Sequence, residues 1–167
     1  AANKVIVTET KMGGVPVLDI RPSDWKHNGK VLFYTHSGAY TMFSARSTLN
    51  SSAPMSRATG LRVISVDYTT APFAKWKQIQ EQISSVFKAL LDQGYSKKDI
   101  AIYGDSAGGG LATSTVLNLR DRGMGMPAAV VLLSPGADII DAGDTMQSLE
   151  ITDPLLHYDP LLKTSAI

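Results

Sequence analysis

A serine lies in the middle of a glycine-rich turn, in the segment GDSAGGG at residues 104–110. The apolar run IAIY precedes this turn, and a stretch of small and apolar residues follows it. The letters GDSAG fit the pattern G-x-S-x-G, in which a serine at the apex of a sharp strand-to-helix turn acts as a nucleophile. A serine hydroxyl attacks a carbonyl carbon when a neighbouring base removes its proton. Ser106 is therefore the candidate nucleophile, and the alternative is an ordinary serine in a tight turn.

The residue types around Ser106 suit this chemistry. Gly104 and Gly108 lack the Cβ atoms that would collide in so sharp a turn. The backbone N–H of Ala107 lies at the start of the expected helix, where the helix dipole favours a developing negative charge. Phosphate binding is disfavoured, because no lysine follows the glycines as a P-loop requires, and Thr113 stands where a dinucleotide fingerprint needs glycine or alanine.

The elements that must position this turn alternate along the chain. Apolar runs predict strands at residues 5–7, 15–18, 31–34, 61–68, 99–104 and 127–135, the first two joined as a hairpin across Gly13 and Gly14. Apolar residues at helical spacing predict helices over residues 79–91 and 111–119, with a helical or irregular stretch up to residue 58. Continuous apolar strands alternating with amphipathic helices predict an α/β fold with a mainly parallel sheet covered on both faces.

Composition limits the function classes. The chain has 167 residues, a net charge of +1 and no cysteine, which fits one domain without disulfides, thiolate metal sites or a nucleic-acid footprint. No apolar run approaches the roughly 18 residues that a membrane helix needs. The three histidines, His27, His36 and His157, are scattered along the chain, so no metal or organic cofactor is implied.

The segment GDSAGGGLA at residues 104–112 resembles the nucleophile segment of the hormone-sensitive-lipase-like branch of the α/β-hydrolases, the bacterial carboxylesterase type. Further stretches agree in order and spacing. YTHSGAY at residues 34–40 occupies the place of the family's H-G-G-G turn, VDYTTAP at 66–72 resembles its D-Y-R-L-A-P-E segment, and LLSPGADI at 132–139 resembles a strand end of that family. A weaker likeness to its D-P-x-L stretch follows at residues 151–163.

The resemblance implies an α/β-hydrolase fold and a carboxylester hydrolase that forms an acyl-enzyme on Ser106, with short-chain acyl esters as substrates. It assigns the oxyanion hole to the backbone N–H groups of Gly38, Ala39 and Ala107, and it makes His36 a residue that shapes the loop rather than the base. Ala39 stands where the family has a glycine, so its Cβ narrows the backbone conformations open to this loop.

The acid and the base that would activate Ser106 are expected outside this chain. The chain order in α/β-hydrolases is serine, acid, histidine, and His157 is the one histidine after Ser106. If His157 were the base, the acid would be Asp138, Asp141, Asp144 or Asp153. In the family both groups follow later strands. We therefore expect residues 1–137 to be the N-terminal part of the core and residues 138–167 to be the start of a cap region.

A second polypeptide or a further C-terminal part would then supply the remaining strands and complete the triad. The strand at residues 127–135 would otherwise be a long apolar edge, which promotes aggregation. The expected partner is a small-molecule ester, with no nucleic acid and no membrane span. The family favours a cytoplasmic bacterial protein, although the sequence leaves the compartment open. The alternatives are an acyltransferase, amidase or lactonase with the same nucleophile, and a non-catalytic small-molecule binder that keeps the fold.

Overall fold

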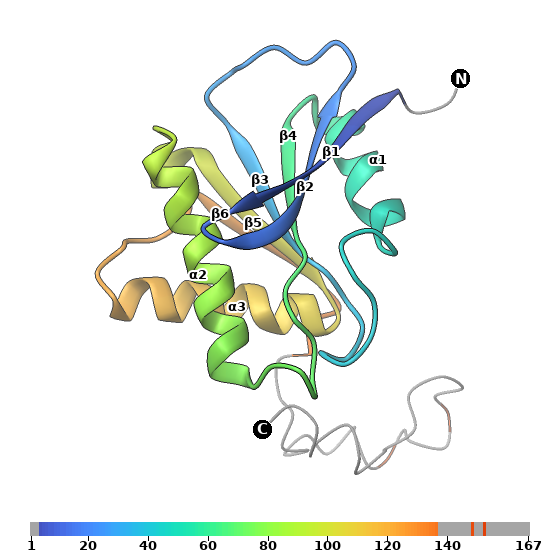
Figure 1. The fold of residues 1–167 in the computed structure, drawn as a ribbon, viewed down its shortest axis with the longest axis vertical. Coiled ribbons are helices and arrows are strands. Elements are labelled where there is room, and N and C mark those ends of the chain that lie inside the picture. The colour runs from blue at the N-terminus through green and yellow to red at the C-terminus, as the bar shows by residue number, and fades with distance from the viewer. Residues whose placement is uncertain (1–3, 137–147, 149–151, 153–167) are drawn as a thin grey trace.

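The described residues form a twisted six-stranded sheet with helices on both faces (Figure 1). The computed structural model describes residues 4–136, Ser148 and Thr152, so the expected cap region at residues 138–167 lies almost wholly outside the described residues. The strands are β1 (Val5–Met12), β2 (Val15–Pro22), β3 (Val31–Thr35), β4 (Arg62–Val66), β5 (Ile100–Asp105) and β6 (Ala129–Leu133). The helices are α1 (Leu49–Thr59), α2 (Trp76–Asp92), a short 3₁₀ helix η1 (Lys97–Asp99) and α3 (Ala107–Asp121). The predicted α/β class is confirmed, with strand order β1-β2-β4-β3-β5-β6.

β1 and β2 form the hairpin predicted from the glycine pair between them. Gly13 and Gly14 have φ angles of 56° and 81°. A two-residue turn with both φ angles positive matches the twist of the strands that it joins, and glycine adopts these angles without strain. β2 also pairs antiparallel with β4, so the hairpin extends the sheet on the side away from β6.

The remaining strands position the Ser106 turn. β4, β3, β5 and β6 run parallel to one another, which brings their carboxyl ends to one edge of the sheet. Thr35 pairs in register with Gly104, and Asp105 pairs with Leu133. Because β5 lies between β3 and β6, Ser106 follows a strand that has a neighbour on each side. Open α/β sheets bind their ligands at this edge.

The sheet lies between α1 on one face and α2 and α3 on the other (Figure 1), and an apolar layer lies on each face. Neighbouring residues of β3 point into different layers. Phe33 packs in the layer under α2 and α3, and Tyr34 packs in the layer under α1. The Phe33 ring meets the Phe87 ring of α2 edge to face, with centroids 6.2 Å apart. Both aromatic residues on β3 are fully buried, so the strand before the 36–40 loop is fixed from both faces.

β6 is the exposed apolar strand that the sequence predicts. Within the described residues, all five of its residues are exposed, and the exposed fractions of its large side chains are 38% for Val130, 47% for Val131, 40% for Leu132 and 46% for Leu133. Successive side chains of a strand point to opposite faces. Both faces of β6 are therefore open in the described part of the chain. Among the described helices, none is both long enough and apolar enough to span a bilayer.

A buried ion pair ties the hairpin to the amino end of β4. The Arg62 guanidinium donates two hydrogen bonds to the Asp19 carboxylate, at 3.1 and 2.8 Å, and a third to the Tyr95 hydroxyl at 3.1 Å. Arg21 donates two more to Asp19, at 2.9 and 2.7 Å. Burial alone would raise the pKa of Asp19, but the hydrogen bonds from both arginines outweigh it and hold the pKa below its ordinary value of 3.8.

We expect Asp19→Asn to lower the free energy of unfolding of the full protein by about 3 kcal/mol at neutral pH, because it leaves buried guanidinium charge without its carboxylate. The folded pKa of Asp19 is lowered, so the carboxylate stabilises the fold above pH 3.8 and this contribution is lost as the pH falls through the folded pKa. The difference between wild type and variant should therefore shrink in acid, as urea unfolding at several pH values would measure.

Asp24→Asn is the matched control, since Asp24 pairs with Arg57 at the surface and exposed pairs contribute little. Equal losses in the two variants would contradict a special role for the buried pair.

Candidate functional site

Ser106 occupies a strained backbone conformation between β5 and α3. Its φ and ψ angles are 52° and −122°, outside the regions open to L-residues at low cost. The surrounding backbone holds it there. Its N–H donates to the Leu133 carbonyl at 3.0 Å, and its carbonyl accepts from the N–H groups of Gly109 at 3.0 Å, Gly110 at 3.2 Å and Gly136 at 2.8 Å. The side chain of Ser106 is exposed and forms no hydrogen bond that caps α3, so its hydroxyl is free to meet a ligand.

The two glycines of the motif permit this packing. A Cβ on Gly104 would clash with the carbonyl of Gly108, and a Cβ on Gly108 would clash with the carbonyls of Thr35 and His36. The first turn of α3 thus lies directly against the end of β3. The Thr35 hydroxyl, fully buried, also donates to the Gly108 carbonyl at 2.7 Å.

Thr35 is not among the site residues expected from the sequence. A hydroxyl at the last position of an otherwise apolar strand is the one local signal that marks it.

Three successive residues of the 36–40 loop have positive φ angles. They are 113° at Gly38, 51° at Ala39 and 61° at Tyr40. The Gly38 carbonyl accepts from the N–H groups of Thr41 and Met42, at 3.0 and 2.8 Å, which closes a tight turn after β3. No backbone hydrogen bond among the described residues uses the N–H of Gly38 or Ala39.

The 36–40 loop and the start of α3 lie together at the edge where the strands end. A Cβ on Gly110 of α3 would clash with the Tyr40 hydroxyl, just as one on Gly108 would clash with His36. The Ala107 N–H is in the first turn of α3, where backbone N–H groups have no intrahelical partner. The structure therefore brings this N–H to the same edge as the loop that carries Gly38 and Ala39. A negatively charged oxygen is the group such free N–H donors bind best.

His36 is packed inside the loop, and neither of its ring nitrogens contacts Ser106. His36 is fully buried, and its ring stacks on the Tyr68 ring with centroids 4.0 Å apart and planes 8° apart. Its Nδ1 lies 2.7 Å from the Ser37 carbonyl oxygen, and the Tyr68 hydroxyl donates to the His36 carbonyl at 2.8 Å. Burial is the largest influence on the pKa of His36 and lowers it below 6.5. The neutral imidazole then donates through Nδ1, and its Nε2 has no partner among the described residues.

The remaining described histidine, His27, packs among aromatic rings. The His27 ring lies near the rings of Trp25 and Tyr95, each with centroids 5.8 Å away. Asp138, Asp141, Asp144, Asp153 and His157 lie outside the described residues. Within the described part of the chain, no group of three or more acidic or histidine side chains is arranged to hold a metal ion.

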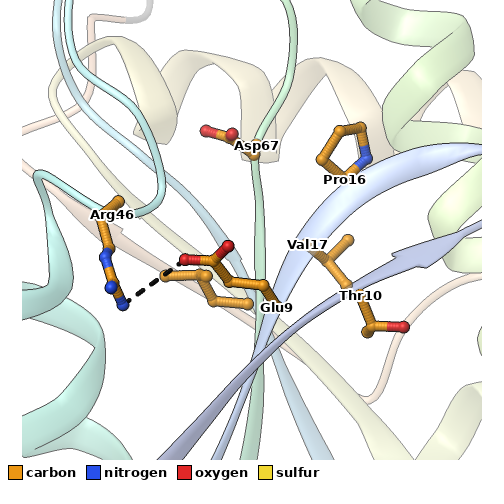
Figure 2. Close-up of a pocket in the computed structure, with 7 residues that line it drawn as sticks. Glu9, Thr10, Pro16, Val17, Arg46 and Asp67 are labelled. Atoms are coloured by element: carbon orange, nitrogen blue, oxygen red, sulfur yellow. Dashed lines mark ion pairs between the residues drawn. The ribbon is translucent and has the colours of Figure 1, made fainter.

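A small open pocket lies elsewhere, between the β1–β2 hairpin, the end of β4 and the loop before α1 (Figure 2). Its lining residues are Glu9, Thr10, Pro16, Val17, Leu18, Arg46 and Asp67. Arg46 faces Glu9 across it at 3.6 Å, and the Asp67 carboxylate accepts from the Ala45 N–H at 2.7 Å. Its charged groups therefore have partners within the chain, and neither Ser106 nor the 36–40 loop contributes to it.

Comparison with known proteins gives a consistent result. A family model described as alpha/beta hydrolase fold matches residues 32–164. LipR of Mycobacterium tuberculosis is 39% identical over 92% of this chain and 47% of its own length. An acetyl-hydrolase of Streptomyces hygroscopicus is 32% identical over 82% of this chain and 45% of its own length. The crystal structure of an esterase from the bacterial hormone-sensitive lipase family superposes with a TM-score of 0.89 at 30% identity, covering 96% of this chain and 54% of that one. The chain thus spans about half the length of the curated relatives that it matches.

We expect Ala39→Gly to raise the free energy of unfolding of the full protein by about 1 kcal/mol. The φ angle of Ala39 is 51°, a left-handed conformation that costs an L-residue about 1–2 kcal/mol and glycine almost nothing. Thermal or urea unfolding would measure the change.

Ala89→Gly, in the last turn of α2, is the matched control. It should have the opposite sign, a loss of about 1 kcal/mol, because glycine is a poor helix former. If both variants had a lower free energy of unfolding than wild type, the Ala39 methyl group would stabilise the fold by more than its backbone strain costs.

Proposed function

The chain belongs to the alpha/beta hydrolase fold family, and on that premise we propose that it forms the nucleophile-bearing part of a serine carboxylester hydrolase of the hormone-sensitive-lipase-like type. One observation carries the proposal. Ser106 is held in a strained backbone conformation at the start of α3, with its side chain exposed. A strained residue costs about 1–3 kcal/mol, and such residues cluster where function requires them.

In the proposed reaction, Ser106 Oγ attacks the carbonyl carbon of an ester, and its proton passes to a histidine base. The carbonyl oxygen becomes an oxyanion, which the N–H groups of Gly38, Ala39 and Ala107 stabilise. The histidine then protonates the leaving alcohol as the C–O bond of the ester breaks. Water attacks the acyl-enzyme by the same route and releases the carboxylic acid and free Ser106.

The base and its carboxylate partner come, in this proposal, from a part of the protein other than the described residues. His36 supports this, because its Nδ1 faces the Ser37 carbonyl and its ring is stacked on Tyr68. His27 supports it too, because its ring lies among Trp25 and Tyr95 rather than beside Ser106. His36 keeps the proposed role of shaping the loop, which suits the hydrogen bond that its carbonyl accepts from Tyr68.

The proposed substrates are small esters with a short acyl chain. The support is the name of the Streptomyces hygroscopicus relative, an acetyl-hydrolase. The reaction needs no metal or organic cofactor, because the three backbone donors carry the developing charge.

A further polypeptide segment, in the same chain or in a second one, is proposed to cover β6. The support is that the large apolar residues on both faces of this strand are each 38% to 47% exposed. An unpaired apolar edge strand is a site for strand addition and aggregation. Added strands and helices would remove that liability.

The first experiment is labelling of the full protein with a fluorophosphonate, followed by mass spectrometry and an assay with p-nitrophenyl acetate. We expect one adduct on Ser106, because these reagents modify activated serines. Ser106→Ala should abolish labelling and lower kcat by a factor on the order of 10⁶.

Ser134→Ala is the control, because Ser134 is an exposed serine in the segment just after β6. It should label as wild type does. An unlabelled wild-type protein would exclude the esterase mechanism and favour a binding protein built on the same fold.

A second experiment tests the cover on β6. Val131→Lys should lower the free energy of unfolding of the full protein by about 3 kcal/mol or more, since it would bury a charge under the added segment. Ile6→Lys is the matched control, because Ile6 is 56% exposed on the opposite edge strand, β1. Equally small losses for the two variants, measured by urea unfolding, would mean that β6 stays open to solvent.

A further inference from the structure

A tyrosine on β3 hydrogen bonds to the residue immediately before the nucleophile. The Tyr34 hydroxyl donates to Asp105 Oδ1 at 2.6 Å. Tyr34 is fully buried, whereas Asp105, the last residue of β5, is half-buried. A hydrogen bond this short to a carboxylate belongs to the stronger class of protein hydrogen bonds. The mechanism proposed above gives neither residue a task.

The Tyr34 ring has little freedom to release Asp105. It stacks on the ring of Tyr103, with centroids 4.6 Å apart and planes 25° apart. Burial, as the largest influence, and the hydrogen bond to Asp105 both raise the pKa of Tyr34 far above its ordinary value of 10.0. The hydroxyl is therefore protonated at neutral pH and can donate to Asp105.

A free Asp105 carboxylate would have another donor close at hand. An aspartate side chain readily accepts a hydrogen bond from the backbone N–H two residues further along, the arrangement called an Asx turn. For Asp105 that N–H belongs to Ala107, in the first turn of α3. Carboxylates favour the positive end of a helix for the same reason that an oxyanion does. Without its hydrogen bond to Tyr34, the Asp105 carboxylate would compete for a donor that the proposed mechanism needs.

We propose that Tyr34 is a positioning residue, whose hydrogen bond keeps the Asp105 carboxylate off the Ala107 N–H so that this donor stays free for the oxyanion. The inference rests on the proposed serine hydrolase function. It assigns Asp105 two restraints, since its backbone pairs with Leu133 of β6 while its side chain is held from β3. It also predicts that the importance of Tyr34 depends on the presence of a carboxylate at position 105.

The test is a double-mutant cycle in the full protein, with Tyr34→Phe, Asp105→Ala and the double variant. Tyr34→Phe should lower kcat for p-nitrophenyl acetate about tenfold, equivalent to about 1.4 kcal/mol in the transition state, with KM unchanged within about twofold. In the Asp105→Ala background the same substitution should change kcat by less than about twofold, because no carboxylate remains to compete. Asp105→Ala alone should keep the wild-type kcat, because it removes the competing carboxylate, whereas a merely structural role for the Tyr34–Asp105 hydrogen bond would make Asp105→Ala lose as much as Tyr34→Phe.

Tyr103→Phe is the matched control. The Tyr103 hydroxyl is buried and has no hydrogen-bond partner among the described residues, so its removal keeps the stacked ring and should leave kcat and KM unchanged. The rate of fluorophosphonate labelling of Ser106 separates two failures. A wild-type protein that does not label would overturn the proposed function and this inference together. A wild type that labels, with Tyr34→Phe labelling equally fast, would overturn the inference alone.

Discussion

The conformation of one residue organises this structure. With φ at 52° and ψ at −122°, Ser106 cannot rest in any common backbone region, so its neighbours must supply the stability that it lacks. Four backbone hydrogen bonds meet at this residue: its N–H donates to Leu133, and its carbonyl accepts from Gly109, Gly110 and Gly136. Because two of these partners belong to β6 or the segment after it, the turn depends on contacts far along the chain as well as on its own helix. The glycine at position 108 is a consequence of the same constraint, since it lets α3 start directly against the end of β3.

The parallel register of β3 and β5 places the loop after β3 beside the turn that contains Ser106. Thr35 pairs with Gly104, so the loop after β3 and the helix after β5 leave the sheet at the same level. That shared level brings the N–H groups of Gly38, Ala39 and Ala107 to one edge, although the first two lie about 70 residues before the third in the sequence. The strain at Ala39 belongs to the same arrangement, because the loop needs a left-handed residue at a position that carries a methyl group.

Much of this could be predicted from the sequence, where the signal is local. The glycine pair specified the hairpin, and the strand-glycine-serine-helix pattern specified the turn at Ser106, because each depends on residues that are neighbours in the chain. Helix α1 could only be expected as helical or irregular, because Pro54 lies inside it and its buried residues are the serines Ser52 and Ser56 rather than an apolar face. The Tyr34–Asp105 hydrogen bond joins residues 71 positions apart, and the Asp19–Arg62 pair joins residues 43 apart. No periodicity or motif reports such contacts, because they exist only once the strand order is known.

The state of β6 and the geometry of Ser106 are physically linked. The Leu133 carbonyl that accepts from the Ser106 N–H is the last of β6, and the Gly136 N–H that donates to the Ser106 carbonyl follows three residues later. Any motion of this exposed strand is therefore transmitted to the strained residue through two hydrogen bonds. A segment that pairs with β6 would restrict that motion, and Ser106 would gain rigidity without a direct contact. A polypeptide segment that covered β6, as proposed, would therefore also stabilise the turn that presents Ser106.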